Sequence, residues 1–268
     1  MKTFAVMNQK GGTAKTTTVV NLAAALGELG KRVLVVDLDP QANASAWLGY
    51  PDSPDERGLF EVLTAQQPLA EVIRPTEVKG VDIAPSSSWL VSAERALLGQ
   101  KSGELNLRRA LAAQPAKWDF ILIDCPPSLG LLAVSALAAA EQVLVPVEAK
   151  VMALAGLASL VRTVETAKER LNPELELTAI LACRVTQTKL AREVIEQLGK
   201  TFRGRVLKTV VRENIRVAEA WSHGVPVTTY APRCNGSQDY RAVAEELLAR
   251  KGRRKASKRK ASKRRSKK

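Results

Sequence analysis

The chain has 268 residues, of which 46% are hydrophobic, and this suits one large α/β domain or two small ones with a substantial core. Three scattered cysteines, Cys125, Cys183 and Cys234, favour neither a disulfide framework nor a zinc site and are typical of a reducing cytoplasm. The formal net charge of +14 is concentrated at one end, because residues 250–268 contain 13 of the 41 Lys and Arg residues and no acid. Residues 1–249 are therefore nearly neutral.

Hydrophobic stretches long enough to cross a membrane are not found in this sequence. The longest apolar stretches, 129–140 and 151–161, are shorter than the roughly 20 residues that a membrane span needs, so they predict core helices. Met1 and Lys2 lead directly into the first apolar run, so no signal peptide is expected. We expect no stable association with a membrane.

Strand-like and helix-like segments alternate along the chain. Most helical patterns lie between apolar runs, which predicts a doubly wound, mainly parallel sheet with helices on both faces and a ligand at the carboxyl ends of its strands. An irregular surface excursion is expected over residues 47–77, with one short helix at 59–65. The predicted strands are 3–8, 32–37, 81–85, 120–124, 142–147, 177–183 and 206–211, and the predicted helices are 15–28, 105–113, 154–171, 191–200 and 238–250.

The first predicted strand is followed by a glycine-containing loop and a helix, an arrangement that binds phosphate. Glycines let successive backbone N–H groups turn toward phosphate oxygens, and the helix N-terminus adds a partial positive charge. Lys15 is placed to reach the phosphates, and Thr16 to bind Mg²⁺. Lys10 has no role in the general pattern, and Ala14 replaces its last glycine. The loop reads Lys10, Gly11, Gly12, Thr13, Ala14, Lys15, Thr16 and Thr17.

Two further apolar runs end in carboxylates. Asp37 and Asp39 follow the run 33–36 within the sequence DLDPQAN, and Asp124 follows 120–123 and precedes Cys-Pro-Pro. Asp37 and Asp39 are two residues apart, so an extended strand end presents both on one face. Carboxylates at this edge suit a magnesium-dependent phosphoryl transfer.

The three motifs together, in this order and spacing, resemble the ParA/MinD superfamily of deviant Walker A ATPases, and the similarity continues to about residue 249. The resemblance implies a P-loop NTPase domain of the SIMIBI class over residues 1–249. It also implies that Lys10 contacts phosphate across a dimer interface, which makes the homodimer ATP-dependent.

The resemblance further implies roles for individual residues. Lys10, Lys15 and Asp39 would be catalytic, with Asp39 orienting or activating water. Thr16, Asp37 and Asp124 would serve the Mg²⁺ site, and residues 10–17 would bind ATP. The positions that usually flank the adenine are occupied here by Cys183, Arg184, Ala231, Pro232 and Arg233.

In the ParA branch, a basic surface in the C-terminal third binds DNA without sequence preference. Arg216 matches that branch's N-[VI]-R element, although Arg212-Glu213 replaces the Pro-Arg that often precedes it, and Ala155 replaces a frequent Glu near the dimer interface. Solvated helix faces are the alternative interpretation of the other basic residues. Those further candidates are Lys189, Arg192, Lys200, Arg203 and Arg205.

Residues 250–268 predict a disordered polybasic tail, because the segment has no apolar residue larger than alanine. Such a segment binds polyanions, and DNA is favoured over a membrane because no large apolar side chains accompany the charge. A purely solubilising tail is the alternative. The candidate contacts are Arg253, Arg254, Lys255, Lys258, Arg259, Lys260, Lys263, Arg264 and Arg265.

The favoured function is that of a ParA/Soj-type partition ATPase, cytoplasmic and nucleoid-associated, working with a ParB-like centromere-binding protein that stimulates slow hydrolysis. Three alternatives stay open: a MinD-like positioning ATPase at a membrane, an iron–sulfur electron-transfer ATPase, and a DNA-compacting protein with a vestigial ATP site. The sequence does not distinguish chromosome, plasmid or protein-cluster cargo. His223, the only histidine, is expected to be structural.

Overall fold

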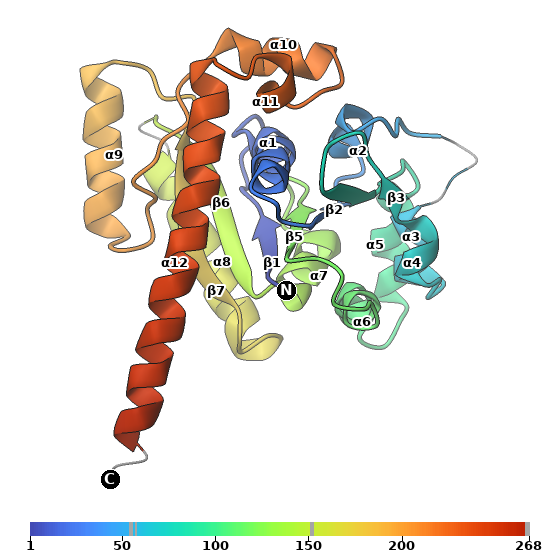
Figure 1. Cartoon of the computed structure of the whole chain (residues 1–268). Helices are drawn as coiled ribbons and strands as arrows, with labels where there is room; N and C mark the ends of the chain where they lie inside the picture. Colours follow the sequence, from blue (N-terminus) through green and yellow to red (C-terminus); the bar gives the residue numbers. More distant parts are fainter. Residues whose placement is uncertain (54–55, 57, 151–152, 266–268) are drawn as a thin grey trace.

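The computed structural model describes residues 1–53, 56, 58–150 and 153–265, and the side chains of these residues up to Arg250. Figure 1 shows the chain as helices packed around a central sheet. The strands are β1 (Thr3–Val6), β2 (Val33–Asp37), β3 (Arg74–Pro75), β4 (Val81–Ala84), β5 (Phe120–Asp124), β6 (Gln142–Glu148) and β7 (Glu176–Cys183). The helices are α1 (Lys15–Glu28), α2 (Asn43–Trp47), α3 (Leu59–Thr64), α4 (Leu69–Val72), α5 (Leu90–Leu98), η1 (Gly103–Leu105), α6 (Asn106–Ala112), α7 (Leu131–Ala139), α8 (Ala153–Arg170), α9 (Lys189–Thr201), α10 (Ile215–Ser222), α11 (Val227–Tyr230) and α12 (Asn235–Arg265).

The strands form one sheet in the order β3-β4-β2-β5-β1-β6-β7, which confirms the predicted doubly wound α/β fold. All neighbouring pairs are parallel except β3 with β4. After β1 the chain first builds the side of the sheet that ends in β3, and it later builds the other side with β6 and β7. Because the strand order reverses at β1, a crevice is expected at the carboxyl ends of the strands there. In the register of β2 and β5, Asp37 lies directly beside Asp124.

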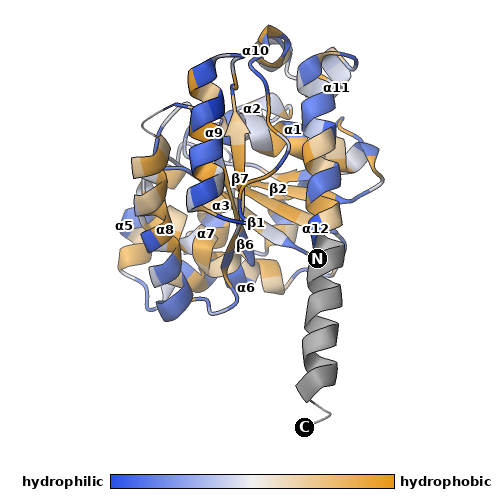
Figure 2. Ribbon diagram, turned by 90° about the vertical axis from the view of Figure 1, so that its left-hand side faces the viewer, coloured by the Kyte–Doolittle hydropathy of each residue, from blue (hydrophilic) through white to orange (hydrophobic). Residues whose placement is uncertain are grey.

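Helices cover both faces of the sheet and enclose two cores. One core joins the sheet to helices α3 to α9, and the other joins it to α1, α2, α10, α11 and α12. The strand side chains are buried on both faces, as expected for a parallel sheet covered on both sides. Figure 2 shows hydrophobic strands inside and hydrophilic residues along the outer side of α9.

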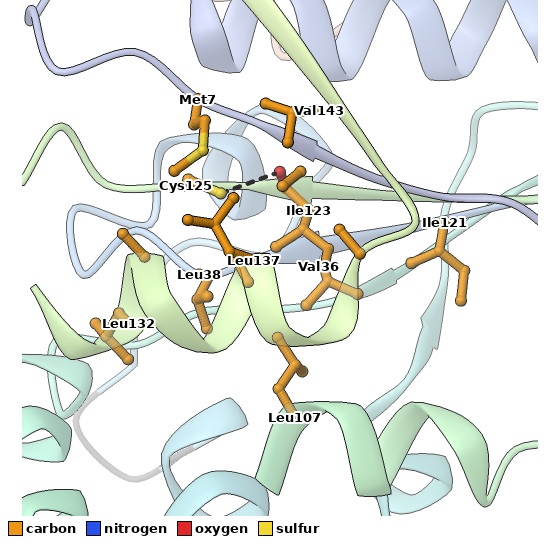
Figure 3. Close-up of a cluster of buried hydrophobic side chains, with 14 of the residues drawn as sticks. Met7, Val36, Leu38, Leu107, Ile121, Ile123, Cys125, Leu132, Leu137 and Val143 are labelled. Atoms are coloured by element: carbon orange, nitrogen blue, oxygen red, sulfur yellow. Dashed lines mark hydrogen bonds between the residues drawn. The ribbon is translucent and has the colours of Figure 1, made fainter. Parts of the chain in front are cut away.

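The hydrophobic core extends up to the residues that carry the predicted motifs. Met7, Leu38 and Cys125 each follow the last residue of β1, β2 or β5, and all three are buried with the core side chains drawn in Figure 3. The Cys125 thiol also donates to the carbonyl oxygen of Ile123 at 3.6 Å. Because each strand end is anchored in this way, the adjacent polar residues have a rigid base.

The predicted strand at 206–211 is wrong. The segment forms no named strand: two isolated bridges, Ile180 with Val206 and Val185 with Arg212, and a hydrogen bond from the Val211 N–H to the carbonyl oxygen of Ala182 join it to β7. Between them the Lys208 and Thr209 N–H groups donate to the carboxylate of Glu246, at 3.0 and 2.9 Å. The Glu246 side chain on α12 therefore takes two N–H groups that a strand would pair with its neighbour.

The excursion at 47–77 contains more regular structure than the one short helix predicted, since α4 and β3 follow α3 there. Helices α5, α10 and α11 were also not predicted. Asp39 lies beyond the end of β2, so the prediction that Asp37 and Asp39 share one face of a strand is wrong. Asp37 instead ends the strand and Asp39 stands on the loop that follows.

Helix α12 packs on α1 and continues past Arg250, where the sequence predicts the start of a disordered tail, to Arg265. Because the side chains of 251–268 lie outside the described residues, the disorder of this segment stays a prediction. Within the described part of the chain, no helix is both long and apolar enough to cross a membrane.

Candidate functional site

The loop between β1 and α1 is shaped to surround an anion. Gly12 and Ala14 both have left-handed backbones, with φ of 73° and 66°, and a Cβ added at Gly11 or Gly12 would meet nothing within 4 Å. Ala14 is the N-cap of α1 and provides no side-chain acceptor, so the first N–H groups of the helix stay available to a ligand. The open space inside the loop fits phosphate oxygens.

Hydrogen bonds fix this loop to the sheet. The Asn8 amide donates to the carbonyl oxygen of Pro146 in β6 at 2.7 Å, and its oxygen accepts from the Lys10 N–H at 3.1 Å. The Thr13 hydroxyl donates to the Lys10 carbonyl oxygen at 3.2 Å. These bonds give the loop a fixed shape at the end of β1.

A cavity of about 890 Å³ opens in front of the loop, at the carboxyl edge of the sheet. On the phosphate side it is lined by Gly11, Gly12, Ala14, Lys15, Thr16 and Thr17, together with Asp39. The cavity thus brings together most of the predicted phosphate loop and the predicted catalytic carboxylate. Its size suits a nucleotide.

The far wall of the cavity differs in part from the sequence prediction. Of the five residues predicted to flank the adenine, Cys183 and Arg184 line the cavity, whereas Ala231, Pro232 and Arg233 are not among the described residues that do so. The wall is completed by Val211, Arg212, Glu213, Asn214, Ile215, Val217, Trp221 and Trp47. Asn214 and Ile215 of the N-[VI]-R element and the preceding Arg212 and Glu213 were considered in the sequence only in relation to DNA binding, and their place in the cavity wall was missed.

Arg212 and Glu213, the departures from the resembled pattern, both have partners. The Arg212 guanidinium pairs with Asp239 at 2.6 Å, and the Arg212 N–H donates to the same carboxylate at 2.9 Å. Glu213 lies 3.7 Å from the guanidinium of Arg184. The two residues therefore stiffen the cavity wall.

Three carboxylates meet beside the phosphate loop. Asp37 is fully buried, and its Oδ2 accepts from both the N–H and the hydroxyl of Ser45 at 2.7 Å. Burial raises the pKa of Asp37 to about 6, although these hydrogen bonds favour its charged form. Burial and the negative charge of the neighbouring Asp37 raise the pKa of Asp124 well above its ordinary value. Thr16 and the positive charge of Lys15 act in the opposite direction and lower this pKa.

Asp124 is the carboxylate that best fits a metal ion. Both of its oxygens are buried, and neither has a hydrogen-bond partner among the described residues. No group of three or more His, Cys, Asp or Glu side chains in that part of the chain could hold a metal alone. This donor set fits Mg²⁺, which is usually bound by one or two carboxylates plus phosphate oxygens and water. Asp37 lies beside Asp124 and accepts two hydrogen bonds from Ser45, and its role at the metal site stays a prediction.

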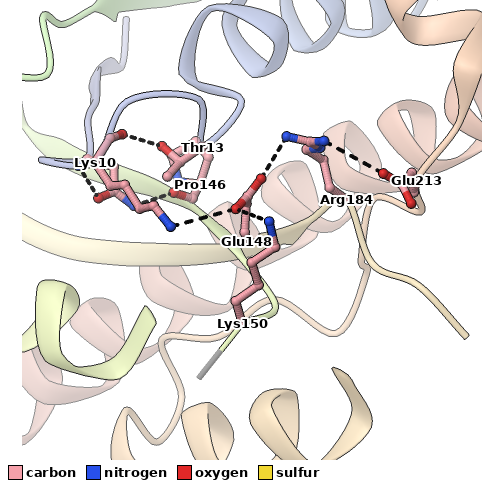
Figure 4. Close-up of polar contacts among 8 residues, drawn as sticks. Lys10, Thr13, Pro146, Glu148, Lys150, Arg184 and Glu213 are labelled. Carbon is pink, nitrogen blue, oxygen red and sulfur yellow. Dashed lines mark hydrogen bonds and ion pairs between the residues drawn. The ribbon is translucent and has the colours of Figure 1, made fainter. Parts of the chain in front are cut away.

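Lys10 is not among the described residues that line this cavity, and its side chain extends toward Glu148 at the end of β6 (Figure 4). The nearly buried Glu148 carboxylate lies 2.7 Å from Arg184, 3.0 Å from Lys150 and 3.9 Å from Lys10. Burial raises the pKa of Glu148, but the surrounding cations have the larger combined effect. The hydrogen bond and charge of Lys150 and the charges of Arg184 and Lys10 lower this pKa below its ordinary value of 4.5. No sequence motif had singled out Glu148.

The predicted DNA-binding residues of the body lie in two places. Arg216 is on α10 above the cavity and pairs with Glu219 at 2.7 Å. Lys189, Arg192 and Lys200 lie exposed on α9, where Lys200 pairs with Glu196 at 2.7 Å. Arg203 and Arg205 follow α9 and line a second cavity of about 850 Å³, toward the opposite edge of the sheet. His223 ends α10 and stacks on Tyr230, a structural position.

Known proteins resemble this chain along nearly its full length. Residues 1–177 match a family model described as an AAA domain. The chain is 42% identical over 249 residues to the sporulation initiation inhibitor protein Soj of Bacillus subtilis, an alignment that covers 92% of this chain and 98% of Soj. It is 39% identical over 246 residues to the chromosome partitioning protein ParA of Myxococcus xanthus, covering 91% and 87%.

A solved structure agrees with these relatives in fold. Cobyrinic acid a,c-diamide synthase from Mycobacterium smegmatis, with bound ATP analog and magnesium, superposes with a TM-score of 0.82 at 33% identity, covering 92% of this chain and 94% of that one. The phosphate loop, the carboxylates at the neighbouring strand ends and the extent of these similarities lead to one conclusion: the chain belongs to the ParA/Soj family of P-loop ATPases.

Proposed function

We propose that this protein is a DNA-partition ATPase that binds ATP and Mg²⁺, dimerises around the nucleotide and releases its partners after hydrolysis. The observation that supports ATP binding is the phosphate loop, which shares one cavity with Asp39, while Asp124 lies buried at the end of β5 beside Asp37. Relatives named for chromosome partitioning, and a structural neighbour with a bound ATP analog and magnesium, support the same choice.

Different residues at this site would have different roles in phosphoryl transfer. The loop N–H groups and Lys15 bind and neutralise the phosphates, and the Thr16 hydroxyl and Asp124 would hold Mg²⁺. When bound, Mg²⁺ supplies further positive charge at the phosphates. Asp39 accepts the proton of the attacking water or orients it. The apolar wall formed by Val211, Ile215 and Val217 would receive the base.

The direction of Lys10 supports its predicted action in a partner subunit. Within one subunit its ammonium lies near Glu148 and outside the residues that line the cavity. Its side chain is 59% exposed, so it is accessible to a second copy of the chain. Hydrolysis would then remove the phosphate that joins the subunits, because binding and dimerisation are linked.

The DNA-bound state is assigned to the dimer and to the basic tail. Arg216 and the exposed cations of α9 would contact phosphates in the body, and residues 250–268 would add affinity without sequence preference. A ParB-like centromere-binding partner would stimulate hydrolysis, and DNA binding would place the protein on the nucleoid.

Phosphate release from radiolabelled ATP tests the enzymatic part of this proposal. Asp39→Asn should slow hydrolysis by about 100-fold or more, the usual contribution of a positioned general base, while ATP still binds. Lys15→Ala should abolish nucleotide binding. Asp52→Asn, an exposed carboxylate outside the cavity, is the matched control and should hydrolyse ATP normally. Normal turnover by Asp39→Asn would contradict the assigned role.

A further inference from the structure

Asp39 stands on a loop, and hydrogen bonds from elsewhere in the chain determine where that loop lies. Its carboxylate accepts locally from the Gln41 N–H at 3.0 Å. Its backbone carbonyl oxygen accepts from the hydroxyl of Ser86 at 2.7 Å. Ser86 follows β4, so a neighbouring strand end fixes the main chain of the predicted catalytic residue.

Ser86 is connected in turn to Asp37 through a second serine. The Ser86 N–H donates to the Ser45 hydroxyl oxygen at 2.8 Å, and the Ser45 hydroxyl donates to Asp37 Oδ2 at 2.7 Å. Asp37 Oδ1 closes the ring by accepting from the Asp39 N–H at 3.3 Å.

This ring uses each donor and acceptor in a chemically consistent way. Each serine hydroxyl donates its single proton once, Ser45 to Asp37 and Ser86 to Asp39, and Ser45 also accepts from Ser86. Ser45 is 0% and Ser86 5% exposed, so water cannot readily replace these bonds. In a buried network, each lost bond leaves an unpaired polar group.

We propose that Ser45 and Ser86 are positioning residues that hold the Asp39 loop in its catalytic geometry. The proposal rests on the proposed function, in which Asp39 acts on the attacking water. The phosphates are bound by a different segment, the loop 10–17, and none of the hydrogen bonds that form the ring involves it. The serines should therefore govern the rate of hydrolysis and leave nucleotide binding and dimerisation unchanged.

A small displacement of Asp39 is sufficient to produce a large effect, because a shift of about 1 Å in a catalytic group lowers the rate by about 100-fold. Ser86→Ala removes the bond to the Asp39 carbonyl and keeps the Ser86 N–H. Ser45→Ala removes the hydroxyl at the centre of the ring. We expect single-turnover hydrolysis to fall by about 10-fold to 100-fold in each variant.

A purely structural role would give a different pattern of results. Ser135→Ala is the matched control, since Ser135 is also 0% exposed but donates within α7 to Leu131, away from the site. The variants are compared in the full-length chain by hydrolysis rate, affinity for a fluorescent ATP analogue, ATP-dependent mass by light scattering, and Tm. Ser45→Thr, which keeps the hydroxyl, should restore the rate.

The expected result is a slowed chemical step in Ser45→Ala and Ser86→Ala with affinity within about twofold of the original protein, and normal hydrolysis in Ser135→Ala. If both serine variants hydrolyse ATP at the wild-type rate while Asp39→Asn does not hydrolyse it, the positioning role is overturned and the proposed function of Asp39 stands. If Asp39→Asn itself hydrolyses ATP normally, the proposed function fails and the positioning role falls with it.

Discussion

Ala14 occupies the position where the general phosphate-loop pattern has glycine, and its left-handed φ of 66° shows what that exchange requires. The left-handed region costs a residue with a Cβ about 1–2 kcal/mol. The strain is located at the N-terminus of α1, where N–H groups must point inward at a ligand. Strain of this kind is tolerated where the surrounding structure determines the backbone.

The conformation of Ala14 predicts that Ala14→Gly stabilises the protein. Relief of the left-handed strain should exceed the entropy that glycine adds to the unfolded chain and the loss of a methyl contact, for a net gain of about 0.5 kcal/mol. Ala24→Gly, in the interior of α1, should lower stability by about 1 kcal/mol. Urea unfolding measures both, and two changes of the same sign would contradict this account of Ala14.

Individual residues also show what the sequence could predict about the site. The loop residues from Gly11 to Thr17 and Asp39 were predicted from local motifs, and the structure brings most of them to one cavity. Glu148, Ser45 and Ser86 were not predicted. Their roles depend on contacts between segments that are distant in sequence, and no local pattern reports such contacts.

At the scale of elements, the end of β6 is built around one carboxylate and several cations. Glu148 is nearly buried, and Arg184 and Lys150 approach it to 2.7 and 3.0 Å from outside the strand. Removing the carboxylate leaves those cations facing one another. The same change frees Lys10 from its intrasubunit neighbour.

We predict that Glu148→Gln lowers the free energy of unfolding by about 1–2 kcal/mol at neutral pH, because a hydrogen bond to a charged group contributes about 1.5–3 kcal/mol and the exposed cations around Glu148 reduce that value. Because the pKa of Glu148 is lowered in the folded state, its contribution is present above the unfolded-state pKa and is lost as pH falls through the lower folded-state value. The two proteins should therefore converge in stability at strongly acidic pH.

Urea titrations from neutral to acidic pH check this prediction. Glu196→Gln serves as the control, because Glu196 is 66% exposed and its ion pair with Lys200 is screened by solvent. That variant should match the original protein at every pH. A stability difference for Glu148→Gln that persists undiminished into strong acid would show that packing, and not charge, is responsible.

The elements that the sequence predicted best have strong local patterns. Helix α1 and strand β5 were predicted with the observed bounds, because apolar periodicity and flanking polar residues define them locally. The segment 206–211 is also apolar but lies at the sheet edge, where Glu246 accepts from the N–H groups of Lys208 and Thr209. Tertiary contacts decide such edge segments.

The distribution of charge is the main feature at the scale of the whole molecule. A nearly neutral body of 249 residues precedes a segment with 13 cations and no acid. In the proposed function, the neutral body would release DNA when its nucleotide changes, whereas the polybasic segment would bind DNA with either nucleotide. The two parts should therefore respond differently to nucleotide and to salt.

Binding of a non-specific DNA duplex by the full chain and by residues 1–249 separates these contributions. If about 6–10 cations contact phosphates, affinity of the full chain should fall by about 10³–10⁵-fold between 50 and 200 mM salt. The truncated protein should show a smaller salt dependence and bind only with ATP. If the truncated protein binds DNA equally with ATP and with ADP, residues 1–249 do not contain the nucleotide-dependent switch.

In the proposed mechanism, ATP joins two subunits through Lys10. In an Asp39→Asn background, which slows hydrolysis, light scattering should show a doubled mass on addition of ATP and Mg²⁺. Lys10→Ala in the same background should stay monomeric, while Lys117→Ala, which loses an ion pair with Asp82 of β4 and a cation–π contact with Trp118, should dimerise normally. An ATP-dependent doubling of mass in Lys10→Ala would contradict the account.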